Sequence, residues 1–326
     1  MACAAVLVLI VGLAYAPVFS ASYVYEDARW LGQEGATVDA RGLSVLAWQV
    51  TPDALSGHVL SLGLHLLTGA LLWVFLRRLA LSALTAYLAV LVFLRHPLTV
   101  ESVAYLAART ELITAIGVLG ACILTAGPWR WWTAPAILGA LLIGLGGKET
   151  AAIALLLIPL TLWVTRSTWW EPATWLGTLG LTIGVIVMGG PQRLANIGDE
   201  YGITATDWLL AQSAAAHRLL SLSLWPSGLT VDPDIDLITH GWRLAAVSLL
   251  AGLSVLAYRL RQTQPLITFG LTWTLLTILP RLIVQTPRGY LNDHQGYLAL
   301  IGITIAAAAW SEEINWRLGE DPKRPA

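Results

Sequence analysis

Long apolar runs separated by short polar segments constrain this chain more than any other feature. An α-helix advances about 1.5 Å per residue, so a hydrocarbon core of about 30 Å needs roughly 20 apolar residues to cross it. About ten runs approach this length, at 2–20, 57–76, 79–94, 112–126, 131–147, 150–165, 173–189, 242–258, 266–284 and 294–310. The pattern predicts an all-α, multi-pass membrane protein with about ten transmembrane helices.

The composition indicates that lipid is the solvent for this chain. Hydrophobic residues make up 56% of the 326 residues and charged residues only 12%, which is about half the charged fraction of a soluble domain. Many of the 16 tryptophans lie at the ends of the apolar runs, as in interfacial aromatic belts. The net charge of −1 provides no bulk attraction to nucleic acid. Membrane lipid is therefore the expected surrounding, and nucleic acid is not an expected partner.

Arginines in the short loops predict the orientation. With ten spans, the short loops on one face all carry basic residues, namely Arg77, Arg78, Arg130, Arg166, Arg259 and Arg261. Basic residues in short loops mark the cytoplasmic side, here of a bacterial inner membrane, so both termini are expected inside. A single membrane domain over 1–310 and a cytoplasmic tail over 311–326 follow. We interpret the mixed run 208–225 as an external amphipathic helix in the interface; an eleventh span is the alternative.

Nearly all residues capable of chemistry fall in five external loops on this topology, at 21–56, 95–111, 148–149, 190–241 and 285–293. The first loop contains Glu26 and Asp27 just after a span, where carboxylates are costly unless they are solvated or useful. This pair could act as a general base toward a hydroxyl or hold a divalent cation. A solvated loop start is the structural alternative.

The second external loop carries a series of polar residues that leads into the next apolar run. His96 opens the series, and Glu101, Tyr105 and Arg109 follow at four-residue spacing, before Glu111. That spacing predicts one face of a helix. Arg109 suits a phosphate, because its planar guanidinium donates two parallel hydrogen bonds. An ion-paired helix start is the alternative interpretation.

Two more polar clusters interrupt the apolar pattern. Lys148 and Glu149 stand between two runs that almost no loop separates, and this lysine could simply extend to the interface. His294 opens the last run; it could bind phosphate, transfer a proton or cap the helix. The two cysteines, Cys3 and Cys122, show no metal-binding or disulfide spacing.

Taken in chain order, the clusters form a series. Tyr25-Glu26-Asp27 follows the first run, and His58 and His65 lie in the second. The series continues with His96-Pro97, Glu101, Val103, Arg109, Glu111 and Leu112, then Lys148-Glu149, Leu224 to Asp232, and Asp293 to Tyr297. This order resembles the transmembrane O-mannosyltransferase family whose animal members carry tetratricopeptide repeats, together with its bacterial relatives, in the GT-C class of polyprenyl-phosphate-sugar glycosyltransferases. Glu26, Thr99 and His294 depart from the family pattern, and the repeat domain has no counterpart here.

The resemblance implies a GT-C-like fold and a reaction. A polyprenyl-phosphate-linked sugar would be the donor, and a hydroxyl on a protein, glycan or lipid the acceptor, with inversion at the anomeric carbon. Asp27, with Glu26, would be the catalytic base. The donor phosphate would be bound by Arg109, Lys148, His294 and His96. The supporting residues would be Glu101, Glu111, Glu149 and Tyr105, of which Glu101 and Glu149 would orient Arg109 and Lys148. No metal or other cofactor is required, although the acidic pair could hold a divalent cation.

Two other classes of function stay open at this point. A transporter or flippase for a lipid-linked substrate would use the same basic groups to bind phosphate without catalysis. The chain has no evident inverted repeat and no matching pair of Pro/Gly-broken helices, which many transporters have. The second alternative is a non-catalytic membrane scaffold. The identity of the sugar and of the acceptor does not follow from the sequence.

Overall fold

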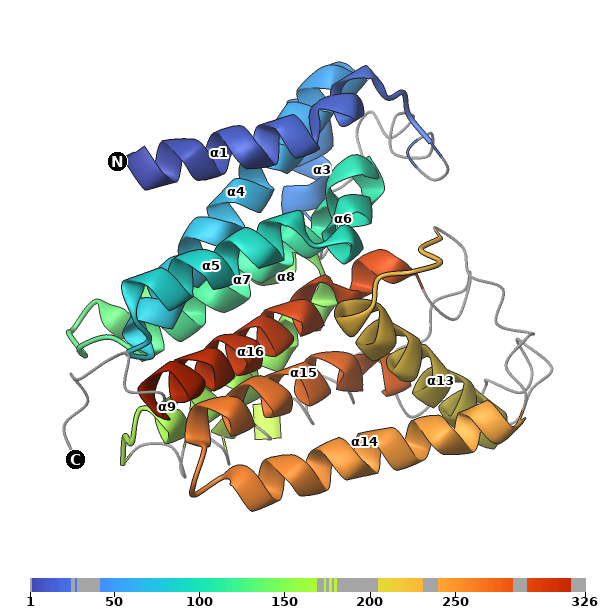
Figure 1. The fold of residues 1–326 in the computed structure, drawn as a ribbon. Coiled ribbons are helices and arrows are strands. Elements are labelled where there is room, and N and C mark those ends of the chain that lie inside the picture. The colour runs from blue at the N-terminus through green and yellow to red at the C-terminus, as the bar shows by residue number, and fades with distance from the viewer. Residues whose placement is uncertain are drawn as a thin grey trace.

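The computed structural model describes residues 2–24, 27, 42–168, 173, 176, 177, 179, 180, 205–230, 240–283 and 292–317. Every regular element in these residues is a helix (Figure 1). This confirms the all-α prediction for the part of the chain that the structure describes. Glu26 lies outside the described residues, as do residues 190–204 and 231–239 of the expected loop 190–241 and residues 285–291 of the expected loop 285–293.

The first half of the chain contributes helices from the N-terminus to the end of the sixth apolar run, with η marking 3-10 helices. They are α1 (Ala2–Ala14), η1 (Ala16–Ser20), α3 (Gly42–Gln49), α4 (Ala54–Arg78), α5 (Ala83–Arg95), η2 (Pro97–Thr99), α6 (Val100–Ala104), η3 (Leu106–Ala108), α7 (Arg109–Thr125), α8 (Thr133–Gly147), η4 (Glu149–Ile153) and α9 (Ala154–Val164). The second half contributes α13 (Ala205–Leu224), α14 (His240–Leu260), α15 (Pro265–Ile283), η5 (Asp293–Gly296) and α16 (Tyr297–Arg317).

Local sequence signals explain the ends of the long helix α4. The Asp53 side chain accepts a hydrogen bond from the Ser56 backbone N–H at 2.7 Å, and the Ser56 hydroxyl lies 3.3 Å from the Asp53 backbone N–H. This capping box satisfies donors that the first helical turn leaves unpaired. Arg77 and Arg78 occupy the last turn, where positive charge complements the helix dipole. At 25 residues, α4 is about 37 Å long and can cross a bilayer.

Three helices among the described residues are long and apolar enough to cross a membrane: Ala54–Arg78, Leu106–Thr125 and Asp293–Arg317. A fourth candidate is a broken span made of Ala83–Arg95 and Pro97–Ala104, which meet at 55°. The structure therefore supports membrane character with three or four spans in these residues, whereas the sequence predicted ten or eleven. Other expected runs form shorter apolar helices, and 173–189 lies largely outside the described residues.

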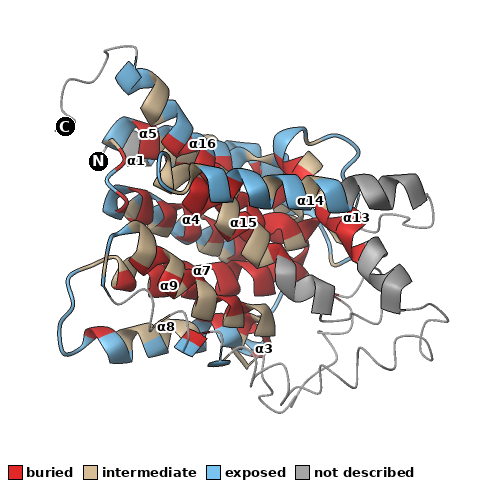
Figure 2. Cartoon of the chain, turned by 90° about the horizontal axis from the view of Figure 1, so that it is seen from below, coloured by how far each residue is buried: buried red, intermediate tan, exposed pale blue. Residues whose placement is uncertain are grey.

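The long helices pack against one another as a bundle (Figure 1). Helix α7 contacts α4, α8 and α9, and α15 packs along α16. The contact between α7 and α8 is close, because a Cβ atom at Gly117 would overlap the Gly144 backbone. Small residues at such crossings allow membrane helices to approach each other. Figure 2 shows the consequence: α7 is largely buried inside the bundle, α4 buries one face, and α14 lies on the outside.

Large apolar side chains are exposed along the outer helices. Leu13 on α1, Leu84 and Val92 on α5, and Leu138 on α8 are each more than half exposed. Soluble monomers rarely expose apolar residues on this scale, whereas hydrocarbon chains cover such side chains without cost. The outer surface is therefore the kind that faces lipid.

Helix α13 covers most of the run interpreted as an interfacial amphipathic helix. The prediction of a helix there is confirmed. Its described middle is buried, with Ala215, Ala216 and Leu219 at most 2% exposed, and it packs against α14, α15 and η5. One face of α13 thus belongs to the helical bundle.

Candidate functional site

The segment from residue 96 to residue 111, here called the central segment, carries half of the site residues predicted from the sequence. The expected loop is in fact η2, α6, η3 and the first turn of α7. The backbone leaves the helical conformation at Tyr105, where ψ is 110°. The prediction that Glu101, Tyr105 and Arg109 share one helical face is therefore wrong. The break directs these side chains to different partners.

Asp27 is attached to the central segment. Its carboxylate is buried, with Oδ1 accepting from the Ala107 N–H at 2.9 Å and Oδ2 from the Val24 N–H at 3.0 Å. Burial raises the pKa of Asp27 above its ordinary value of 3.8, while the two backbone hydrogen bonds and the nearby His58 and Arg109 act in the opposite direction. A carboxylate with a raised pKa is a better proton acceptor near neutral pH than an ordinary aspartate.

Arg109, the first residue of α7, points into the bundle and is 1% exposed. Its Nε donates to Ser61 Oγ at 3.2 Å, Nη1 to the Ala47 carbonyl at 3.0 Å and Nη2 to the Gly57 carbonyl at 3.4 Å. The guanidinium also lies 5.3 Å from the centre of the Trp48 ring. A Cβ atom at Gly57 would lie 3.1 Å from Nη2, so the glycine makes room for the charge. Two of the five guanidinium N–H donors are not engaged by the described residues.

His58 on α4 also belongs to this site, although the sequence indicates it only through the resemblance to the glycosyltransferase family. It is 1% exposed, and neither ring nitrogen has a hydrogen-bond partner among the described residues. The Ala21 carbonyl lies nearby without hydrogen-bonding geometry, and the ring interacts electrostatically with Asp27 and Arg109. By contrast, His65 is fully paired, with Tyr297 and the Leu94 carbonyl. An ionisable residue inside an apolar run was the signal that could have identified His58.

Lys148 lies at the junction of α8 and η4 and pairs with Glu111, at 2.6 Å between Nζ and Oε1. The side chains are 13% and 6% exposed. The sequence prediction assigned Glu149 to Lys148, whereas the observed ion pair joins Lys148 to the central segment. Ser44 on α3 donates to the Gly147 carbonyl at 3.1 Å, which places α3 over the same junction.

His294 in η5 is held by Glu101. The His294 backbone N–H donates to Oε2 of Glu101 at 2.7 Å, and the imidazole Nδ1 lies 2.7 Å from Oε1. The Tyr105 ring meets the imidazole edge-on, with centroids 6.0 Å apart. If Nδ1 carries the proton that Glu101 accepts, Nε2 of the neutral ring is an acceptor. Glu101 therefore orients His294, and the prediction that it orients Arg109 is wrong.

A second charged pair lies beside this histidine. Arg218 on α13 donates from Nε and Nη2 to the two carboxylate oxygens of Asp293 at 3.2 and 3.1 Å, and the Thr230 N–H adds a bond of 2.9 Å. His96 binds the Ser223 carbonyl through Nε2 at 3.1 Å. Both contacts attach the C-terminal end of α13 to the central segment and η5.

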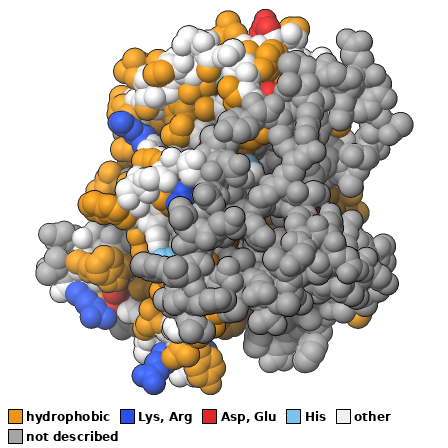
Figure 3. All heavy atoms as spheres, turned by 90° about the vertical axis from the view of Figure 1, so that its right-hand side faces the viewer, with side chains coloured by type: hydrophobic (Ala, Val, Ile, Leu, Met, Phe, Trp, Pro, Cys, Tyr) orange, Lys and Arg blue, Asp and Glu red, His pale blue; other side chains and the backbone are white. Residues whose placement is uncertain are grey.

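These clusters lie at one end of the bundle, around α6 and the start of α16 (Figure 1). Figure 3 looks onto this end, where Lys or Arg and His side chains are visible between apolar ones. No group of three or more His, Cys, Asp or Glu that could hold a metal occurs among the described residues. Family models, curated proteins and solved structures provide no match to this chain.

Proposed function

We propose that this chain is a GT-C-type membrane glycosyltransferase, which moves a sugar from a polyprenyl-phosphate donor to an acceptor hydroxyl on the external face. The observation that carries the proposal is the buried Asp27 carboxylate, with its raised pKa, beside Arg109. The other basic residues predicted from the sequence gather at the same end of the bundle. A base and several phosphate-binding groups are the components that this transfer needs.

In the proposed reaction, the acceptor oxygen attacks the anomeric carbon from the side opposite the phosphate. The new carbon–oxygen bond forms as the bond to the phosphate oxygen breaks, so the configuration inverts. Asp27 takes the hydroxyl proton, and the leaving polyprenyl phosphate keeps the electron pair.

Lys148 stabilises the charge that grows on the phosphate, and His294 does so as the imidazolium, with Nδ1 donating to Glu101 and Nε2 to the phosphate. His96 supports the site indirectly, because its two ring nitrogens are hydrogen-bonded to the Ser223 carbonyl and the Leu98 N–H. The two N–H groups of Arg109 that the described residues do not engage can also donate to the phosphate. The buried positive charge of Arg109 favours the ionised form of Asp27.

In the proposed orientation, the end of the bundle that contains Asp27 faces outward and both termini lie in the cytoplasm. The chain would then have the ten-span topology of a bacterial inner membrane protein. The arginines support this orientation. Arg78 ends α4, Arg317 ends α16, Arg130 precedes α8 and Arg166 follows α9, so all four lie at the helix ends opposite Asp27. Basic residues of this kind mark the cytoplasmic side. The shorter apolar helices would need local thinning of the bilayer.

The test mixes the purified full chain with polyprenyl-phosphate mannose and a hydroxyl acceptor, and measures the release of free polyprenyl phosphate. Asp27→Asn should lower the rate by about 10²–10⁴-fold, the usual contribution of a positioned base. Asparagine keeps one of the two backbone hydrogen bonds, because its NH₂ group cannot accept from the second N–H. Thermal unfolding of the variant therefore accompanies the rate measurement.

Three outcomes would contradict the proposal. Full turnover by a folded Asp27→Asn variant would remove Asp27 from the mechanism. Movement of intact donor between leaflets without release of polyprenyl phosphate would indicate a flippase. Neither release nor movement with any acceptor tried would favour a non-catalytic scaffold.

A further inference from the structure

A cavity of about 1140 Å³ lies between α5 and α16. It reaches from His96 and Ser223 at the Asp27 end of the bundle to Ser82, Glu312 and Asn315 at the opposite end. Its volume exceeds that of pockets for drug-sized ligands, which hold about 300–1,000 Å³. None of the reactions considered above uses this space.

The middle of the cavity is apolar and elongated. Its walls include Leu84, Leu88 and Val92 on α5, and Ile303 and Ala307 on α16. The α5 residues are also exposed on the outer surface, so the cavity opens toward the bilayer. The 13 residues of α5 span about 20 Å, compared with about 15 Å for half of a bilayer core. This shape fits an extended hydrocarbon chain.

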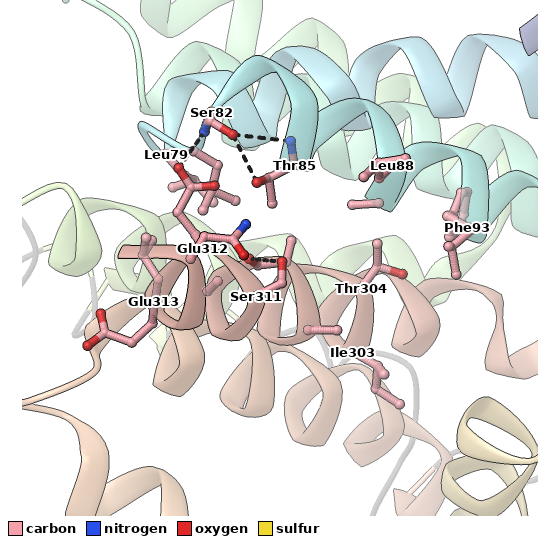
Figure 4. Close-up of a pocket in the computed structure, with 18 of the residues that line it drawn as sticks. Leu79, Ser82, Thr85, Leu88, Phe93, Ile303, Thr304, Ser311, Glu312 and Glu313 are labelled. Carbon is pink, nitrogen blue, oxygen red and sulfur yellow. Dashed lines mark hydrogen bonds between the residues drawn. The ribbon is translucent and has the colours of Figure 1, made fainter. Parts of the chain in front are cut away.

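The end opposite Asp27 is polar and contains an unsatisfied carboxylate oxygen. Glu312 reaches from α16 toward the start of α5, where its Oε1 accepts from the Ser82 N–H at 3.0 Å (Figure 4). Its Oε2 is buried and has no hydrogen-bond partner among the described residues. An unpaired carboxylate oxygen removed from water is costly. The position is therefore suited to a hydrogen-bond donor that none of the described residues supplies.

The charge of the lining decides which donor fits. Glu312 and Glu313 both line the cavity, and none of its described lining residues is a lysine or arginine. Arg317 pairs with Glu313, at 3.0 Å between Nε and Oε1, so the charge of Glu313 is compensated within α16. A cation with N–H groups complements Glu312, and the nearby amides of Gln264 and Asn315 can donate to a phosphate.

We propose that this cavity binds a phospholipid with a primary ammonium head group, of the phosphatidylethanolamine class. The ammonium donates to Oε2 of Glu312, neutral donors such as Asn315 face the phosphate, and one acyl chain runs between α5 and α16 toward His96. This lipid site takes no part in the proposed glycosyl transfer, so each of the two proposals can be tested without the other. A trimethylated ammonium cannot donate the required hydrogen bond, and an anionic head group would repel the carboxylates.

The experiment is native mass spectrometry of the full chain in a non-ionic detergent. Phosphatidylethanolamine, phosphatidylcholine and phosphatidylglycerol with identical acyl chains are added in turn, as is a polyprenyl phosphate. A charge-assisted hydrogen bond predicts retention of phosphatidylethanolamine about tenfold better than phosphatidylcholine. Glu312→Gln keeps the Ser82 bond through its carbonyl oxygen and should abolish this preference. The matched control Glu313→Gln should preserve it, and Leu88→Trp should reduce retention of all three phospholipids by filling the apolar wall.

Several results would overturn the proposal. Equal retention of the three phospholipids by the wild type would remove head-group recognition. A preference that survives in Glu312→Gln, or that Glu313→Gln abolishes equally, would remove the assigned role of Glu312. Stronger retention of phosphatidylglycerol would contradict the charge argument. Stronger retention of polyprenyl phosphate than of phosphatidylethanolamine would assign the cavity to the sugar donor.

Discussion

Replacing Arg109 by lysine tests whether the fork of the guanidinium, rather than its charge alone, holds the candidate site together. Three acceptors on α3 and α4 surround the guanidinium in different directions. A lysine carries the same charge on a single nitrogen, which cannot reach three acceptors spaced for a planar group. We expect Arg109→Lys to keep one of the three hydrogen bonds.

The magnitude follows from the two lost bonds. A hydrogen bond from a charged donor contributes about 1.5–3 kcal/mol, so the loss is about 3–6 kcal/mol. The Ala47 carbonyl keeps a second bond, from the Thr51 hydroxyl at 2.8 Å, and the Gly57 carbonyl lies within helix α4. Neither acceptor becomes unpaired, which places the expected loss near 3 kcal/mol. For a chain of this size this lowers Tm by on the order of 5 °C.

The assay is thermal unfolding followed by tryptophan fluorescence in one detergent, together with release of polyprenyl phosphate. Arg95→Lys is the matched control, because Arg95 is exposed at the end of α5; its Tm should equal that of the wild type. We also expect Arg109→Lys to slow turnover more than its loss of stability explains, since Asp27 loses a fixed neighbouring charge. A wild-type Tm and wild-type turnover in Arg109→Lys would refute this reasoning.

Three further predictions concern the other clusters. Because the folded chain raises the pKa of Asp27 above 3.8, its contribution to stability is greatest at low pH and is lost as the pH rises through that pKa. Turnover should conversely fall as the pH drops through it, and a pH–rate profile with its acid limb at or below 3.8 would contradict this. Glu111→Gln should cost about 1–3 kcal/mol in thermal unfolding by leaving Lys148 without its carboxylate; an unchanged Tm would argue against the pair. Glu101→Gln should lower turnover about tenfold and shift the ¹⁵N signals of His294, and unchanged imidazole signals would count against that contact.

The helical class and most candidate residues were predictable from the sequence, because apolar runs and isolated charges are local signals. The partners were not. Glu101 and His294 are 193 residues apart, and the break at Tyr105 that turns Glu101 toward η5 leaves no mark in the side-chain periodicity. The nearest charged neighbour of Lys148 in the chain is Glu149, but its observed partner is Glu111 on the adjacent helix.

Helix α3 shows a second limit of the sequence. Residues 42–49 were expected to be part of an external loop, since eight residues are too few for a span. The structure makes them a helix whose Ala47 carbonyl and Trp48 ring contact Arg109. The described residues contain three or four helices long enough to span a membrane, fewer than the apolar runs predict, for a related reason: hydropathy measures apolar length, but does not distinguish a full crossing from a short helix packed against its neighbours.

Four remote parts of the chain contact the central segment: Asp27, helix α4, Lys148 and His294. A change in the length of this segment would therefore alter several contacts at once. One residue inserted into η3 (Leu106–Ala108), which leads directly into α7, would rotate Arg109 and Glu111 relative to the residues before it by about 100–120°. Arg109 would turn away from α4, and Glu111 from Lys148, while the contacts before the insertion stayed in place. The same insertion at Gly127, between α7 and α8, would lengthen only a surface connection. Tolerance to changes in length should therefore differ sharply between these two places, even though both connect apolar helices.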